Sequence, residues 1–184
     1  MILLWPELSM SWEASVMKKV AVLVEDNYQV LEVWYPYLRL REEGLRVVLV
    51  GTGKKEYKSK EGYPAEEELS IKSVKADDFD AVVIPGGYAP DILRRYAEVN
   101  KFVKEMFEQG KVVASICHGG WVLASAGVLK GKTATSFSAI KDDVINAGAK
   151  FLDQEVVVDG NLITSRKPED LPAFCKEIIK KLTR

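Results

Sequence analysis

A chain of 184 residues with 47% hydrophobic residues has enough material for one compact domain with a continuous core. Its 26 Lys and Arg residues nearly balance 27 Asp and Glu residues, and no segment concentrates positive charge, which argues against a nucleic-acid or membrane-surface partner. Two cysteines and one histidine supply neither a disulfide framework nor a typical Cys/His zinc site, so we expect no metal, no cofactor and a reducing, cytoplasmic setting.

The N-terminal residues look only briefly like the start of a signal peptide. Pro6 and Glu7 end the first apolar run, no basic region precedes it, and no small-residue cleavage site follows. No other stretch approaches the ~20 apolar residues of a membrane span. Met17 and the two lysines after it precede an apolar strand, as at a natural chain start. We therefore expect residues 1–16 to be an N-terminal extension or a misassigned start, and residues 17–184 to form a single domain.

Three short runs are almost wholly apolar without alternation, which is typical of parallel strands buried on both faces. They are residues 20–24, 81–84 and 112–116. Helical patterns over residues 30–43 and 92–108 each end at a glycine, Gly44 and Gly110, where helix C-caps belong. Together with a β-branched run over residues 45–50, this order predicts right-handed βαβ units and an α/β fold with helices on both faces of the sheet.

The remaining segments predict edge and terminal elements. Residues 54–75 are polar and turn-rich, as in a hairpin or loop excursion at the sheet edge, and residues 156–158 and 162–164 flank an Asp-Gly-Asn turn typical of a β-hairpin. Pro168, followed by two acids, predicts the first turn of the last helix. Pro36 lies inside the first helical pattern and predicts a kink or a late start there.

The most informative segment for chemistry is residues 114–120, ASICHGG, in which an apolar strand runs into Cys117. A nucleophile at such a strand-to-helix turn is exposed above the sheet, and the following backbone N–H groups and helix dipole stabilise an anion there. Both effects lower a thiol pKa, so we expect Cys117 to react as a thiolate. His118 is the only histidine, so a cysteine–histidine mechanism within one subunit must use it. The alternative is a buried core cysteine.

Cys175 fits that alternative. It belongs to a continuous apolar stripe at helical spacing, which identifies it as a core residue. The stripe comprises Leu171, Phe174, Cys175, Ile178, Ile179 and Leu182.

A second candidate loop follows the run at residues 81–84 and contains Gly86 and Gly87. Ligands of open parallel sheets bind at the carboxyl ends of the strands. Two successive glycines let backbone amides approach a substrate oxyanion closely. The loop lies one strand-helix unit before Cys117, so we expect both to contribute to one site.

Three segments resemble the ThiJ/PfpI superfamily: residues 84–87 (IPGG), 114–119 (ASICHG) and 153–160 (DQEVVVDG). Residues 35–37 and 164–171 are similar to its PfpI intracellular protease group in particular, so the resemblance covers about residues 18–183. It implies a flavodoxin-like three-layer sandwich, like that of class I glutamine amidotransferases, with a nucleophile elbow. It also implies homo-oligomers, dimers or hexamers, and a Cys-His pair completed by an acid from a neighbouring subunit.

The resemblance assigns site residues. Cys117 and His118 match the catalytic pair, and Asp91 stands at the position of the neighbouring subunit's acid. Gly86, Gly87 and His118 would supply the oxyanion-hole amides.

The chain also departs from the family pattern close to the nucleophile. Gly120, after Gly119, replaces a usual proline. The family places a glutamate beside the cysteine, and aligning the first strand puts Gln29 there. Glu25 and Glu32 are nearby alternatives if the loop is shifted.

Three functions use such a thiolate. The leading prediction is a cysteine hydrolase acting on peptides or small amides. The alternatives are a glyoxalase III-like lyase or deglycase acting on small carbonyl compounds such as methylglyoxal and their protein adducts, and a redox sensor or stress chaperone. Moving a carbon-bound proton calls for a carboxylate base beside the cysteine, whereas acyl transfer can use His118. Gln29 at that position favours hydrolysis.

Overall fold

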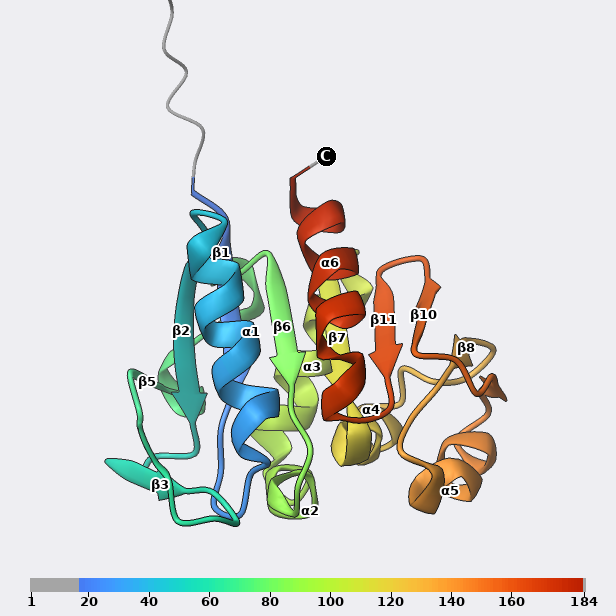
Figure 1. Cartoon of the computed structure of the whole chain (residues 1–184), viewed down its shortest axis with the longest axis horizontal. Coiled ribbons are helices and arrows are strands. Elements are labelled where there is room, and N and C mark those ends of the chain that lie inside the picture. The colour runs from blue at the N-terminus through green and yellow to red at the C-terminus, as the bar shows by residue number, and fades with distance from the viewer. Residues whose placement is uncertain (1–16, 184) are drawn as a thin grey trace, which may run out of the picture.

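The computed structural model describes residues 17–183 of the chain (Figure 1). The N-terminal extension predicted at residues 1–16 lies outside the described residues. The strands are β1 (Lys19–Leu23), β2 (Arg46–Gly51), β3 (Glu56–Lys58), β4 (Pro64–Glu66), β5 (Leu69–Ser70), β6 (Ala81–Ile84), β7 (Val112–Ile116), β8 (Thr133–Ala134), β9 (Lys150–Phe151), β10 (Val156–Asp159) and β11 (Leu162–Ser165). The α-helices are α1 (Val30–Glu42), α2 (Ala89–Leu93), α3 (Ala97–Glu108), α4 (Gly120–Ala126), α5 (Lys141–Asn146) and α6 (Leu171–Leu182).

A seven-stranded sheet in the order β10-β11-β7-β6-β1-β2-β5 forms the centre of the molecule. All its pairings are parallel except the β10–β11 hairpin. Helices α1 and α6 pack together on one face, in front of the sheet in Figure 1, and α3 and α4 pack together on the other. The α/β three-layer fold predicted from the sequence is confirmed.

The central strands are buried on both faces because each sheet face is covered by helices. Every residue of β6 and four of the five residues of β1 are fully or almost fully buried. In the middle of the sheet, Val22 of β1 lies between Leu49 of β2 and Val83 of β6. Among residues 17–183, no helix has the length and apolar character needed to cross a membrane.

Two helical predictions need correction. The pattern over residues 92–108 forms two helices, α2 and α3, because the chain turns at residues 94–96 between them. Pro36 does not delay α1, which begins at Val30 and runs through the proline to Glu42. The sheet-edge excursion after residue 54 is confirmed as the β3–β4 hairpin, followed by β5 beside β2.

Loops at the carboxyl ends of β1 and β6 are tied together by backbone hydrogen bonds. Tyr28 forms isolated β-bridges with Gly87 and with Ser59, which belongs to the turn after β3. The amide of Gln29 donates to the Gly86 carbonyl at 3.2 Å, and the amide of Tyr88 donates to the Asn27 carbonyl at 2.9 Å. Because β7 lies next to β6, these loops and Cys117 meet at one edge of the sheet.

Candidate active site

Cys117 occupies a strained backbone position directly after β7. Its φ of 59° lies in the left-handed region, which costs a residue other than glycine about 1–3 kcal/mol and persists only where the surroundings impose it. The surroundings here are tight, because a Cβ on Gly119 would lie 2.6 Å from the Ile84 carbonyl oxygen and 2.7 Å from Ser115 Oγ. The absence of a side chain at Gly119 therefore allows this turn to lie close to the ends of β6 and β7.

His118 lies directly beside the thiol. Its Nδ1 is 3.2 Å from Cys117 Sγ, and its ring stacks on Phe137 with centroids 5.1 Å apart while meeting Trp121 edge-on at 5.0 Å. Burial lowers the pKa of His118, so the imidazole is neutral at pH 7. A neutral ring fixed by two aromatic side chains can accept a proton from sulfur but adds no positive charge to the site.

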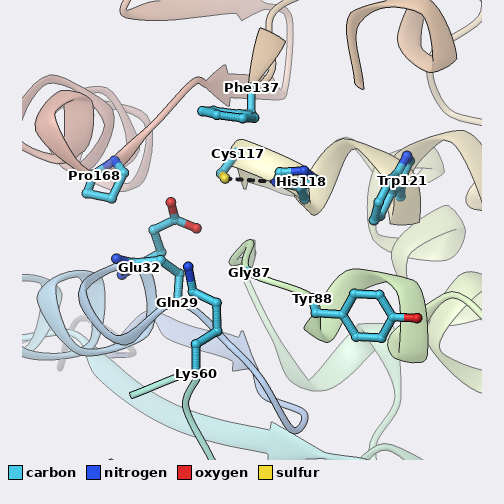
Figure 2. Close-up of a pocket in the computed structure, with 10 residues that line it drawn as sticks. All are labelled: Gln29, Glu32, Lys60, Gly87, Tyr88, Cys117, His118, Trp121, Phe137 and Pro168. Atoms are coloured by element: carbon cyan, nitrogen blue, oxygen red, sulfur yellow. Dashed lines mark hydrogen bonds between the residues drawn. The ribbon is translucent and has the colours of Figure 1, made fainter. Parts of the chain in front are cut away.

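Glu32, in the first turn of α1, is completely buried next to the nucleophile. Its Oε2 accepts a 2.7 Å hydrogen bond from the Gly86 amide, and its Oε1 has no hydrogen-bond partner among residues 17–183. A Cβ on Gly86 would lie 2.6 Å from Glu32 Oε2 and 2.9 Å from Cys117 Sγ, so carboxyl and thiol face the same narrow space. Figure 2 shows the Glu32 carboxyl pointing toward the Cys117 sulfur.

Burial determines the pKa of the Glu32 carboxyl. Loss of hydration raises the pKa of Glu32 from 4.5 to about 7, even though the hydrogen bond from the Gly86 amide opposes the rise. At neutral pH the group therefore exists in comparable amounts as acid and as carboxylate. That is the property required of a group that both donates and accepts a proton during a reaction.

The predicted place of Gln29 beside the thiol is wrong, and the glutamate there is Glu32. Gln29 is the N-cap of α1, and its side-chain oxygen accepts a 2.9 Å hydrogen bond from the Glu32 amide. Gln29 still lines the cavity. Glu25, the other alternative, is buried elsewhere, where its carboxylate accepts hydrogen bonds from Thr52 and from Lys54 at 3.1 Å.

The expected direction of the thiol pKa is also wrong. Burial, followed by the negative charge of Glu32, raises the pKa of Cys117 to about 12, although backbone N–H groups of Gly87 and His118 favour the thiolate. The helix expected directly after Cys117 begins only at Gly120, because residues 117–119 form a 3₁₀ turn before α4, and α4 itself is short. Protonation of Glu32 removes one of the two causes that oppose the thiolate, while burial still opposes it.

Gly87 and Asp91 occupy different surroundings. Gly87, with a φ of 79°, borders the cavity, and a Cβ there would lie 2.5 Å from both the Asn27 carbonyl oxygen and the Gln29 amide nitrogen.

Asp91 does not line the cavity. It lies on α2 and forms an ion pair with Arg95, which lies in the turn after that helix. The single chain therefore does not bring Asp91 to His118, and its role across a subunit interface stays a prediction.

A cavity of about 420 Å³ opens above the thiol (Figure 2). Some of its lining residues, including Lys60 and Phe137, were not singled out from the sequence as site residues. They come from loops far apart along the chain, and no local motif marks them. The full lining is Gln29, Glu32, Lys60, Gly87, Tyr88, Cys117, His118, Trp121, Phe137 and Pro168.

Comparisons with known proteins show similarity over most of the chain. A model of the DJ-1/PfpI family matches residues 18–181, which include every residue of the cavity lining. Deglycase TK1284 of Thermococcus kodakarensis is 48% identical over 164 residues, covering 89% of this chain and 99% of that protein. YraA of Bacillus subtilis, named as a candidate cysteine protease, is 43% identical over 166 residues, covering 90% of this chain and 98% of that protein.

A similar solved structure is a two-domain protein of Anabaena variabilis with DJ-1/ThiJ/PfpI-like and ferritin-like domains. It superposes on 90% of this chain with a TM-score of 0.89 and 46% identity. The chain spans 48% of the length of that two-domain protein.

Proposed function

The chain belongs to the DJ-1/PfpI family, and from that premise we propose that it is a cysteine-dependent enzyme acting on 2-oxoaldehydes such as methylglyoxal and on their adducts. The observation that carries the proposal is the buried carboxyl of Glu32 beside the Cys117 thiol. A group with a pKa of about 7 at that place can move a proton between two carbon atoms, a step that this chemistry needs and hydrolysis does not. Several relatives, TK1284 among them, carry the name deglycase.

The first step is addition. Glu32 takes the thiol proton of Cys117, and the thiolate sulfur forms a bond to the aldehyde carbon while the carbonyl electron pair moves onto oxygen. That oxygen receives the proton back from Glu32, which gives a hemithioacetal. Backbone N–H groups of Gly87 and His118, which border the sulfur, lie where they could stabilise the negative charge during the addition.

The second step moves hydrogen between the two carbons. The Glu32 carboxylate removes the proton from the former aldehyde carbon and delivers it to the neighbouring carbon, while the hydroxyl proton passes to the other oxygen. The product is a thioester of Cys117 with a 2-hydroxy acid. Water then cleaves the thioester, releases the acid and restores the thiol, so no oxidant or reductant is consumed.

The sharpest test replaces Glu32 and measures the 2-hydroxy acid formed from methylglyoxal. We expect Glu32→Gln to lower the turnover by ~10²- to 10⁴-fold, the usual contribution of general acid–base catalysis. Cys117→Ser should abolish it. Glu25→Gln is the matched control, because Glu25 is an equally buried carboxyl outside the cavity, and it should retain activity if circular dichroism shows a folded protein. Full lactate formation by Glu32→Gln would overturn the proposal.

Hydrolysis of peptide or small amide bonds remains a second candidate function. The 3.2 Å approach of His118 Nδ1 to Cys117 Sγ favours it, because such a pair can carry out acyl transfer without Glu32. Parallel assays on unfolded casein and short peptide amides separate the two functions. Cleavage that depends on Cys117 but persists in Glu32→Gln, without turnover of methylglyoxal, would identify a hydrolase.

A further inference from the structure

One cationic side chain borders the cavity among its described lining residues, and it belongs to Lys60. Figure 2 shows the side chain reaching toward the cavity from the wall opposite Phe137. No carboxylate of residues 17–183 lies within 4.0 Å of its Nζ as an ion-pair partner. Lys54, on the preceding loop, is different, because its Nζ pairs with Glu25 at 3.1 Å and Asp26 at 2.8 Å.

The backbone holds Lys60 in a defined place relative to the reacting groups. Its amide donates to the Tyr28 carbonyl at 3.1 Å, and Tyr28 also bridges Gly87. The hydroxyl of Tyr28 donates to the Tyr63 carbonyl at 2.7 Å, and the amide of Gly62 donates to the Ser59 carbonyl at 2.9 Å. The turn that carries Lys60 is therefore fastened to the same loops that shape the site.

Among the lining residues, only Glu32 offsets the charge of Lys60, through an electrostatic attraction that lowers the pKa of Glu32. Glu32 is the one acidic residue of the cavity wall; it is buried, and with a pKa of about 7 it is only partly ionised at neutral pH. The walls formed by Tyr88, Trp121 and Phe137 are aromatic. An anion bound near Lys60 would gain attraction without meeting an exposed carboxylate, while an apolar part of the same molecule packs on the aromatic rings.

We propose that Lys60 determines substrate specificity by binding an anionic group, so that the site prefers 2-oxoaldehydes whose second substituent carries a carboxylate or phosphate. This inference rests on the proposed function, since it names the substrate class of the same site. The carbonyl carbon reacts at Cys117, and the anion lies at the ammonium group of Lys60. No bond forms at Lys60, which acts through charge alone.

The test compares two probes with the same reacting group. Phenylglyoxal is neutral beyond its oxo carbon, and 4-carboxyphenylglyoxal adds one carboxylate. The measured quantity is the ratio of kcat/KM for the charged probe to kcat/KM for the neutral probe, in which general effects of a substitution on the site cancel. We expect a ratio above one that falls with added salt, because salt screens exposed charges.

Lys60→Met keeps an unbranched side chain, one atom shorter, and removes its charge. We expect this substitution to lower the ratio about five-fold, which corresponds to about 1 kcal/mol for an exposed ion pair, and to remove its salt dependence. Lys60→Glu should lower it further. Lys55→Met is the matched control, since Lys55 is an exposed lysine of the same region that does not line the cavity, and its ratio should equal that of the wild type. An unchanged ratio in Lys60→Met, or an equal change in Lys55→Met, would overturn the inference.

A binding measurement separates this inference from the proposed function. 4-Acetylbenzoate and acetophenone resemble the two probes but lack the aldehyde, and NMR titration of Cys117→Ser with each reports binding without chemistry. If the wild type turns over neither probe, yet Lys60→Met in this background removes a preference for 4-acetylbenzoate, the proposed reaction fails and the role of Lys60 stands. Turnover of both probes without any charge preference refutes the role of Lys60 alone.

Discussion

At the scale of single residues, the chemistry of the site depends on which of two groups, Glu32 or Cys117, carries a proton. Each group is buried, and ionisation of either one opposes ionisation of the other. One negative charge is therefore favoured over two. Moving the proton from sulfur to Glu32 puts that charge on the nucleophile, where the amides of Gly87 and His118 favour it.

The raised pKa of Glu32 has a consequence for stability. A carboxyl whose pKa is about 7 in the folded protein and 4.5 when unfolded favours folding fully below pH 4.5, and this contribution is lost as pH rises through 7. We expect the unfolding free energy of the wild type, minus that of Glu32→Gln, to increase by about 2–3 kcal/mol from pH 8 to pH 5.

Urea unfolding of both proteins at the two pH values measures this difference. Subtracting the unfolding free energy of Glu32→Gln removes the effects of other acids. Asp26 and Asp80, for example, have lowered pKa values, which make the protein less stable as the pH falls. A difference that stays constant with pH would show that Glu32 is charged in the folded protein at pH 5.

The sequence contained a usable signal for Glu32. Val30 begins the helical pattern, so residue 29 is expected at the N-cap and residue 32 inside the first turn. Glu32 also shares the core-facing side of α1 with Val33, Pro36 and Leu40, where an acid is exceptional. Aligning the first strand alone placed Gln29 beside the cysteine, because an alignment on a strand leaves the length of the following loop undefined.

At the scale of secondary structure, α1 and the elbow of Cys117 position the reacting groups. Pro36 lacks an N–H group, so it supplies no hydrogen bond to the carbonyl of Glu32 four residues earlier, yet α1 continues through it. The cap provided by Gln29 and the buried face of the helix outweigh that loss. Local preference predicted a kink or a late start at Pro36, and the late start is wrong because tertiary packing stabilises the first turns of the helix.

Gly119 and Gly120 offer a matched comparison at the elbow. Both have right-handed helical backbone angles, with φ of −55° and −54°, so alanine is compatible with the backbone at either position. Their surroundings differ. A Cβ on Gly119 would meet a backbone oxygen at 2.6 Å, whereas one on Gly120 would meet the flexible Ile140 Cδ1 at 3.1 Å.

We therefore expect Gly119→Ala to destabilise the protein by about 1–3 kcal/mol, as overpacking does, and to displace the thiol. Gly120→Ala should change stability by less than about 1 kcal/mol, because the better helix propensity of alanine offsets the closer contact. Chemical unfolding and the rate of iodoacetamide labelling at Cys117 measure the two effects. Equal destabilisation by both substitutions would contradict the packing argument.

At the scale of the whole molecule, the fold could be predicted further than the site. Short, almost wholly apolar runs and terminal glycines specify the central strands and helices, since burial on both faces of a sheet leaves a local signature. The cavity depends on contacts between loops that are distant in sequence. Lys60, Phe137 and Pro168 meet there only because the sheet order brings their loops together, and a linear pattern does not encode that order.

The predicted role of Asp91 depends on the assembly of subunits. Within one chain its carboxylate pairs with Arg95, and the residue is absent from the cavity lining. If Asp91 orients an imidazole, that imidazole belongs to another subunit, as the family resemblance implies. A dissociated subunit would then lack the orienting acid, so the activity should fall on dilution below the dissociation constant of the assembly.

Subunit mixing tests this arrangement directly. Cys117→Ser lacks the nucleophile and Asp91→Ala lacks the acid, so each should be inactive or nearly so alone. A mixed dimer contains one site in which the intact Cys117 of one chain receives the intact Asp91 of the other. Random exchange at equal concentrations makes half of the dimers mixed, with one competent site in each, so we expect recovery of about a quarter of the wild-type activity. Absence of recovery, with exchange verified by native mass spectrometry, would mean that Asp91 acts within its own chain, whereas full activity of Asp91→Ala alone would mean that Asp91 is not needed.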